Sequence, residues 1–472
     1  MNQFPLLQKA YNYTAFEQNG KQLIEQLTAY LNNQQLPESQ ANNWQSPAKE
    51  LGFWENYQFS DLNNFVADLF DHSIHLHNPK YMGHQVSAPA PLTVLTDMIS
   101  GLLNNGSAVY EMGRATTAIE KTVVDLFCEK VGYDNNASGI MTSGGTLANL
   151  TALLAARQAL HGSDIWQDGC REKLAVLVSS QAHYSIDRAA RVMGLGNDGV
   201  VLVPVDTGFA MDQQALATCY SEATEAGFKV IAIVGSACST ATGIYDDLQF
   251  IGDFCQRNDV WFHVDGAHGG AAVFSDKYKS LLKGIEVADS VIIDTHKMMM
   301  TPALSTVVLF KDKKQGSQTF HQKAQYLFAD ANIEDQWYNA GLRTFECTKM
   351  MMCLKFYVLW KTYGIDIFAE NIDCLYGLGE TFAAMVTAHP SYQLALAPQT
   401  NIVCFRYMRR GLSEAQTNEL NKSIRQNLLE DSEFYIVQAV LNDTIYLRVT
   451  LMNPMTTEIH LQQLLEKIES FV

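Results

Sequence analysis

The sequence predicts an α/β fold with an open, mostly parallel central sheet, followed by a smaller α+β domain. The first observation is a series of apolar, β-branched runs that start about 30 residues apart, the length of a βαβ unit. These runs are Leu174–Ser179, Val200–Val205, Val230–Val234, Val260–Val264 and Val291–Ile293. The second is the set of amphipathic segments between them, at Ser185–Met193, Asp212–Glu225 and Asp247–Arg257. The runs are apolar on both faces, which is typical of a sheet covered by helices on both sides.

Three consecutive regions follow from this pattern. Residues 1–95 form an N-terminal helical segment, with helical apolar spacing in Gly20–Asn32 and Ser60–Leu76. Residues 96–360 form the large α/β domain, in which Asp212 and Asp246 are placed to cap helices. Residues 361–472 form the small α+β domain. Its expected elements are a helix at Ile365–Val386, strands at Ile402–Tyr407 and Ile445–Leu451, and a last helix at Glu458–Phe471.

Composition excludes several classes of protein. Of 472 residues, 47% are hydrophobic and 18% charged, and no apolar run reaches the roughly 20 residues that a membrane span needs. The net charge is −17 without a basic cluster, so we expect no nucleic-acid partner. Nine cysteines without a CxxC pair indicate reduced thiols rather than a disulfide framework or a metal site. No signal peptide is recognisable at the N-terminus, and we expect a cytoplasmic protein.

A lysine stands where ligands of open α/β sheets bind, at the carboxyl end of a predicted strand. Lys297 follows Ser290–Ile293 in the sequence Asp294-Thr295-His296-Lys297. A partly desolvated lysine amine can be neutral and nucleophilic, and it can then form a Schiff base. His296 and the three methionines Met298–Met300 supply such surroundings. The alternative is a solvated lysine with no chemical role.

A carboxylate ends the preceding predicted strand. Asp265 follows Val260–Val264, and Gly266, Ala267, His268, Gly269 and Gly270 come next. Pyridoxal 5′-phosphate (PLP) is an electron sink only while its pyridine nitrogen stays protonated, and a carboxylate at that nitrogen maintains the proton. Ala267 is small enough for a ring to lie flat against it. The alternative is an aspartate that caps a helix, which the glycine-rich continuation disfavours.

Two further signals suit the same cofactor. Thr142-Ser143-Gly144-Gly145-Thr146 precedes the Ala/Leu-rich stretch Leu147–Leu160, and glycines before a helix N-terminus make an anion site for a phosphate. His183 follows the strand Leu174–Ser179 and can stack on a pyridine ring, although a lone histidine there is more often a satisfied surface or core residue. We also place Thr240 among the cofactor-binding residues, and we expect no metal.

The order Ser-Gly-Gly-Thr, His183, Asp265-x-Ala267, His296-Lys297 resembles the group II PLP-dependent amino-acid decarboxylases, which include the glutamate, cysteine-sulfinate and aromatic amino-acid decarboxylases. The resemblance runs from about Pro79 to the C-terminus. It implies the aspartate-aminotransferase-like fold of fold type I PLP enzymes and a homodimer with active sites at the interface. It also implies a Schiff base on Lys297, Asp265 at the pyridine nitrogen, and Ala267 and His183 on the two faces of the ring. The phosphate would be surrounded by Gly144, Gly145, Thr146 and His296.

The segment Gln325–Gly364 resembles the glutamate and cysteine-sulfinate branch, through Tyr326-Leu327-Phe328 and Glu346-Cys347. This register places Tyr338 on the loop tyrosine that, in the family, protonates the substrate carbon after CO2 leaves. The alternative for Tyr338 is a loop aromatic without a role, and the neighbouring Trp337 can shift the register by one. Tyr446-Leu447-Arg448 resembles the same branch, in which the arginine binds the α-carboxylate of the substrate; a strand-edge arginine is the alternative.

Departures from the family pattern concern the substrate. Asp294-Thr295 stands where relatives often have Asn-Pro, and Gly113-Arg114 follows Tyr110-Glu111-Met112 where many have proline. At an interface site, Arg114 would suit an acidic substrate side chain. His84 and Gln85 lie where relatives line the substrate pocket, and their polarity disfavours a purely aromatic pocket.

We therefore expect an enzyme that removes the α-carboxylate of a small-molecule L-amino acid, with an acidic substrate (glutamate, aspartate or cysteine sulfinate) favoured. Aromatic and diamino acids stay open, as do other fold type I reactions such as transamination or Cβ–S cleavage. A non-catalytic binder with this fold is disfavoured by the intact Lys297, Asp265 and Tyr338. A nucleotide-binding oxidoreductase is weaker still, because no GxGxxG motif follows a first strand.

Overall fold

The computed structural model describes residues 4–107, 109–160, 165–320, 337–346 and 348–472. The chain folds into two compact units: Gln85–Ala384 with Leu394–Cys404, and the residues through His84 with Met385–Gln393 and Phe405–Val472. In the latter unit the N-terminal segment joins the C-terminal residues through backbone hydrogen bonds. Ala41 N–H donates to the Ser432 carbonyl at 3.1 Å, for example. Each unit therefore combines segments that are distant in the sequence, and the predicted boundaries after residues 95 and 360 stay a prediction.

The larger unit contains a seven-stranded sheet with the order β1-β7-β6-β5-β4-β2-β3. Its strands are β1 (Ser138–Thr142), β2 (Leu174–Ser179), β3 (Val200–Val203), β4 (Lys229–Ser236), β5 (Trp261–Asp265), β6 (Ser290–Asp294) and β7 (Thr306–Phe310). The neighbours from β6 to β3 pair in parallel, while β7 is antiparallel to both β6 and β1. The predicted fold class, α/β with a mostly parallel central sheet, is confirmed.

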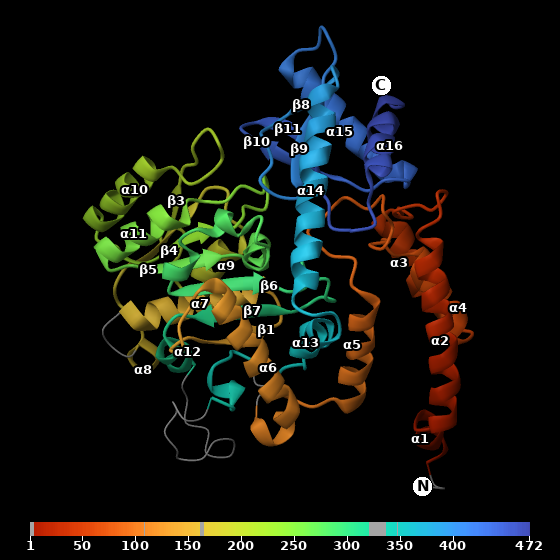
Figure 1. Cartoon of the computed structure of the whole chain (residues 1–472), viewed down its shortest axis with the longest axis horizontal. Coiled ribbons are helices and arrows are strands. Elements are labelled where there is room, and N and C mark those ends of the chain that lie inside the picture. Colours follow the sequence, from red (N-terminus) through yellow and green to blue (C-terminus); the bar gives the residue numbers. More distant parts are fainter. Residues whose placement is uncertain (1–3, 108, 161–164, 321–336, 347) are drawn as a thin grey trace. The chain divides into compact units, whose positions relative to one another are not determined.

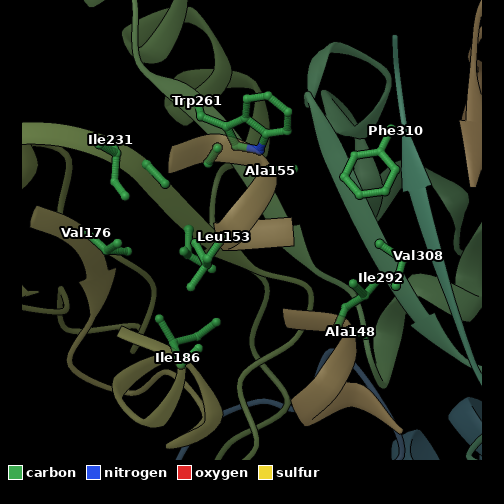
Figure 2. Packing of buried hydrophobic residues seen from close by; sticks show 14 of the residues in the cluster. Ala148, Leu153, Ala155, Val176, Ile186, Ile231, Trp261, Ile292, Val308 and Phe310 are labelled. Atoms are coloured by element: carbon green, nitrogen blue, oxygen red, sulfur yellow. The ribbon is translucent and has the colours of Figure 1, made fainter. Parts of the chain in front are cut away.

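Helices pack on this sheet (Figure 1). Those of the larger unit are α5 (Pro91–Leu103), α6 (Tyr110–Val131), α7 (Gly145–Leu160), α8 (Ile165–Asp168), α9 (Ser185–Val192), α10 (Gln213–Glu225), α11 (Leu248–Asn258), α12 (Lys313–Gln318), α13 (Cys353–Tyr363) and most of α14 (Asp366–Ala388). Short 3-10 helices are η1 (Gly269–Phe274), η2 (Lys279–Leu282), η3 (Ile285–Val287) and η5 (Ala340–Leu342). Figure 2 shows the buried cluster in which α7 residues such as Leu153 meet β2, β4, β5, β6 and β7. This packing fixes the start of α7 against the sheet.

The smaller unit is mainly helical at its N-terminal side. Its helices are α1 (Pro5–Ala10), α2 (Tyr13–Asn33), α3 (Pro47–Glu55), α4 (Leu62–Asp71), α15 (Glu414–Asp431) and α16 (Glu458–Glu469). A second sheet has the order β10-β11-β9-β8. Its strands are β8 (Tyr392–Leu394), β9 (Ile402–Tyr407), β10 (Val437–Leu441) and β11 (Thr444–Thr450). Among the described residues, no helix is long and apolar enough to cross a membrane.

Of the two predicted helix caps, one is confirmed and one is wrong. Asp212 caps α10 as predicted, by accepting the Ala215 N–H at 2.7 Å. The predicted cap Asp246 is wrong, because α11 begins one residue later and Asp247 accepts the Phe250 N–H. Asp246 is instead buried and accepts the backbone N–H groups of Met211 and Ser236, both at 2.7 Å. The sequence pattern also missed β1 and β7.

Candidate active site

A cavity of about 360 Å³ lies at the carboxyl ends of β1, β2, β4, β5 and β6. Its lining consists of Ser143, Gly144, Gly145, Thr146, Asn149, His183, Ser185, Ser236, Cys238, Thr240, Asp265, Ala267, His268, Asp294, His296, Lys297 and Leu304. Every residue that the sequence predicts to bind the cofactor is in this set. Parallel strands bring these distant positions together because they end at the same edge of the sheet.

Lys297 reaches the cavity three residues beyond the end of β6. Its Nζ lies 3.2 Å from Asp294 Oδ2, and its side chain is 19% exposed. Asp294 is buried, and Thr306 Oγ1 donates to its other oxygen at 2.5 Å. The amine is thus positioned by a carboxylate and lines the cavity, where the aldehyde of a cofactor can reach it.

Asp265 ends β5 and is almost completely buried. Asn149 Nδ2 donates to its Oδ2 at 3.0 Å, and Ala267 N–H donates to its Oδ1 at 3.2 Å. A buried carboxylate at the cavity wall is the kind of group that keeps a pyridine nitrogen protonated.

The loop after β1 leads directly into α7. Gly144 has φ of +117°, a backbone conformation that residues other than glycine rarely adopt. A Cβ on Gly145 would lie 3.2 Å from Asp294 Oδ1, which is tighter than almost all real Cβ contacts. The first N–H groups of α7 lack partners within the helix and carry its positive dipole end. These N–H groups for a phosphate, the amine for an aldehyde and the carboxylate for a pyridine nitrogen together fit PLP.

His183 follows β2 and turns its Nδ1 toward Ser185. Ser185 N–H lies 3.2 Å from this nitrogen and Ser185 Oγ lies 2.8 Å from it. Burial lowers the pKa of His183 below its usual value, against the opposing charge of Asp265. The imidazole is therefore neutral at neutral pH, which suits a ring that stacks on a cofactor rather than one that pairs with an anion.

Several predicted substrate residues do not line this cavity. Tyr338 is half-buried, and its ring meets the edge of Tyr110 at 5.3 Å between centroids. Arg114 is exposed on α6. The motif Tyr326-Leu327-Phe328 lies outside the described residues. Glu346 accepts a hydrogen bond from Ser143 Oγ at 2.7 Å, so its segment does reach the loop after β1.

His84 and Arg448 lie near one another in the smaller unit. His84 Nε2 is 3.2 Å from Tyr435 Oη, and Tyr435 stacks on the buried Tyr81 at 5.5 Å. Burial lowers the pKa of His84, and the charge of Arg448 lowers it further. Gln85 begins the larger unit, and its amide Nε2 is buried without a hydrogen-bond partner in the described part of the chain.

Sequence reasoning missed Asn149 and Ser185, which line the cavity and touch predicted cofactor residues. Asn149 contacts Asp265, and Ser185 contacts His183. A signal for Asn149 was present, because it is a polar amide near the start of the Ala/Leu-rich stretch Leu147–Leu160, and the structure buries it. Asp294 was noted as a departure from relatives, but its contact with Lys297 was not predicted.

The model of the pyridoxal-dependent decarboxylase conserved domain matches residues 42–408, which is more than half of the chain. The chain belongs to the pyridoxal-dependent decarboxylase family. It is a PLP-dependent amino-acid decarboxylase, and the predicted family and cofactor are confirmed.

Characterised relatives of this decarboxylase differ in their substrates. It is 28% identical over 453 residues to an aromatic-L-amino-acid decarboxylase of Bacillus atrophaeus, covering 96% of this chain and 91% of the relative. It is also 28% identical over 455 residues to an aspartate 1-decarboxylase of Aliivibrio fischeri, covering 87% and 82%. Among solved structures, the glutamate decarboxylase domain of diaminobutyrate-pyruvate transaminase and L-2,4-diaminobutyrate decarboxylase from Vibrio parahaemolyticus matches with a TM-score of 0.85. That match has 25% identity and covers 96% and 95% of the two chains.

Proposed function

We propose that this decarboxylase acts on an acidic L-amino acid such as glutamate, aspartate or cysteine sulfinate, with Lys297 as the Schiff-base lysine. The single observation that carries the assignment of roles is the cavity, because it unites Lys297, Asp265, Ala267, His183 and the loop before α7. When bound, PLP accepts the electrons of the breaking bond between Cα and the carboxylate. The residues of the chain bind and orient the cofactor and the substrate, and they supply the proton that replaces the lost carboxylate.

Each side chain then has one task. Asp265 holds the proton on the pyridine nitrogen, and the amides of Gly145 and Thr146 with His296 and Thr240 hold the phosphate. His183 and Ala267 keep the ring between them. Tyr338 donates a proton to the substrate Cα after CO2 departs, a step that a phenol performs well when a closed site excludes water. Arg448 binds the α-carboxylate of the substrate, because a guanidinium suits bidentate carboxylate binding.

The preference for an acidic substrate rests on charge and polarity. Arg114 is exposed, and no carboxylate is paired with it among the described residues. The polar His84 and Gln85 favour a substrate with a polar side chain. The relative that acts on aspartate supports the proposal. The Bacillus relative, which the chain matches almost along its whole length, favours an aromatic substrate as the second candidate.

We infer a homodimer from an apolar stripe on α5. Leu95, Met98, Ile99, Leu102 and Leu103 are each at least 40% exposed, and their spacing puts them on one helix face. An exposed apolar face of this kind marks an interaction surface. A second copy of the chain is the occupant that the family resemblance suggests, and it would bring further side chains to the site. A cytoplasmic location stays a prediction from cysteine usage.

A CO2-release screen tests the substrate. The purified protein with PLP is offered each common L-amino acid, cysteine sulfinate and 2,4-diaminobutyrate. We expect the highest kcat/KM with an acidic substrate, and keto-acid formation without CO2 would instead indicate transamination. A clear preference for an aromatic or diamino acid would overturn the substrate proposal and leave the cofactor site unaffected.

A further inference from the structure

A chain of buried hydrogen bonds runs from the core of the sheet to Asp265. Trp261 Nε1 lies 2.8 Å from Ser290 Oγ, which is 2.8 Å from His263 Nδ1. His263 Nε2 lies 2.9 Å from Asn149 Oδ1, and Asn149 Nδ2 donates to Asp265 Oδ2 at 3.0 Å. Ser290 and His263 are completely buried, and neither Ser290, His263 nor Trp261 lines the cavity.

The groups at the two ends of the chain fix its direction. The Asp265 carboxylate accepts, so Asn149 turns its Nδ2 toward it and its Oδ1 toward His263. A neutral His263 then donates from Nε2 to Asn149 Oδ1 and accepts at Nδ1 from the Ser290 hydroxyl. Ser290 Oγ keeps a lone pair for the indole N–H of Trp261, which can only donate. The reversed amide would set an oxygen against the carboxylate of Asp265.

His263 is suited to this task because it stays neutral. Burial lowers its pKa to about 4, even though the neighbouring Asp265 raises it. A neutral imidazole has one donor and one acceptor nitrogen and therefore transmits direction. Asn149 also donates to Ser185 Oγ at 2.9 Å, and Ser185 Oγ contacts His183. One amide thus serves the residues on which the proposed function places the pyridine nitrogen and one ring face.

We propose that Asn149 is a positioning residue for the pyridine end of PLP, and that Trp261, Ser290 and His263 act through it to hold the Asp265 carboxylate in the orientation that keeps the ring nitrogen protonated. The inference rests on the proposed role of Asp265. A purely structural role for these hydrogen bonds would affect folding stability alone. If they have a positioning role, removing them also changes the protonation of the pyridine nitrogen of bound PLP, which can be measured separately from turnover.

The test compares Asn149→Leu with Thr151→Val. Both residues are buried on α7, but the Thr151 hydroxyl donates to the Leu147 carbonyl of its own helix and does not line the cavity. The readouts are PLP affinity of the apo-protein and NMR of PLP labelled at the pyridine nitrogen. For Asn149→Leu we expect affinity to fall roughly tenfold or more, as for a lost hydrogen bond to a charge. We also expect the nitrogen signal to move toward the unprotonated form, whereas Thr151→Val should change neither readout.

A remote variant tests the direction of the hydrogen bonds. Ser290→Ala removes the hydroxyl that sets the tautomer of His263, so a fraction of His263 and Asn149 reverses. We expect the same change in the nitrogen signal with a smaller loss of affinity, about twofold to tenfold. Ser290→Thr keeps the hydroxyl and should restore the signal. This variant also decides the matter where Asn149→Leu does not fold.

Failure of this inference is distinguishable from failure of the proposed function. Asp265→Ala should move the nitrogen signal on its own; if it does not, the role proposed for Asp265 is wrong. If Asp265→Ala moves the signal while folded Asn149→Leu or Ser290→Ala keeps the wild-type signal and affinity, the inference about Asn149 is overturned and the role of Asp265 stands.

Discussion

The cofactor end of the site and the residues proposed to bind the substrate are built differently. The residues predicted to bind PLP all line one cavity at the edge of a single sheet, and buried hydrogen bonds support them. The predicted substrate residues are scattered: Arg114 is exposed on a helix, Tyr338 sits beside Tyr110, and Arg448 and His84 belong to the smaller unit. The residues proposed to bind the cofactor therefore gather at the edge of one sheet, whereas those proposed to bind the substrate lie on separate segments.

The largest effect should come from Lys297 at the cofactor end. Lys297→Ala removes the amine proposed to bond to PLP, so we expect CO2 release to fall to the level of a blank without enzyme. The exposed Lys283 provides a control, because Lys283→Ala should leave the rate unchanged. If Lys297→Ala keeps wild-type turnover, the cofactor end of the site has been assigned wrongly, and the comparison with the substrate residues fails.

The next largest effect should come from Tyr338, one of the residues proposed to act on the substrate. General acid catalysis contributes about a hundredfold to ten-thousandfold, so Tyr338→Phe should slow decarboxylation by at least about a hundredfold. A side reaction, oxidation or transamination, should gain in proportion. Trp337→Phe is the matched control, and it also settles the register of the loop. If Trp337→Phe is slow and Tyr338→Phe is not, Tyr338 is not the proton donor, and Trp337 acts by packing because an indole N–H is too weak an acid to replace it. Unchanged kinetics in both would remove this loop position from the mechanism.

Arg114 should have a smaller, substrate-dependent effect. If it binds an acidic side chain, Arg114→Gln should raise KM for the best acidic substrate roughly tenfold, as for a lost bond to a charge. The rate with non-acidic substrates should not fall. Lys121→Gln on the same helix is the control, because Lys121 pairs with Asp125 on the exposed surface. An equal KM in wild type and Arg114→Gln would show that α6 does not select the substrate.

The last expected effect concerns folding stability and not turnover. Burial holds the pKa of His263 at about 4 in the folded state, against 6.5 for an ordinary histidine. The unfolded chain therefore takes up a proton below about pH 6.5 that the folded chain refuses until about pH 4, so stability is lost as the pH falls through this window. Roughly 3 kcal/mol should be lost from this residue. Urea unfolding of the apo-protein at both ends of the window should show this loss, and His263→Gln should lack it.

Sequence patterns predicted the parallel strands well because each is a short apolar run. β2 has the predicted bounds, and β4, β5 and β6 differ from theirs by a residue or two at an end. β9, in the second sheet, also has the predicted bounds. β7 was missed because an antiparallel strand next to a parallel set breaks the spacing of the βαβ pattern. That the proposed cofactor residues line one cavity was predictable because strand ends share one edge of a sheet.

Side-chain contacts were not predictable in the same way. Asn149 reads as one polar residue in a helical stretch, and only the packing of α7 against the sheet turns it toward Asp265. The cap at Asp246 was assigned wrongly because Asp246 and Asp247 are adjacent in the sequence, and only burial distinguishes them. Residues on segments far apart, such as Arg448 and Arg114, carry no periodic signal that places them.

The attachment point of the cofactor decides whether Lys297 has the role proposed for it. The protein is purified with PLP, reduced with borohydride, digested, and analysed by peptide mass spectrometry. We expect the reduced cofactor on the peptide that contains Lys297, and we expect the unreduced protein to be yellow. A cofactor fixed on another lysine, or a colourless protein that takes up no PLP, would show that the site has been assigned wrongly.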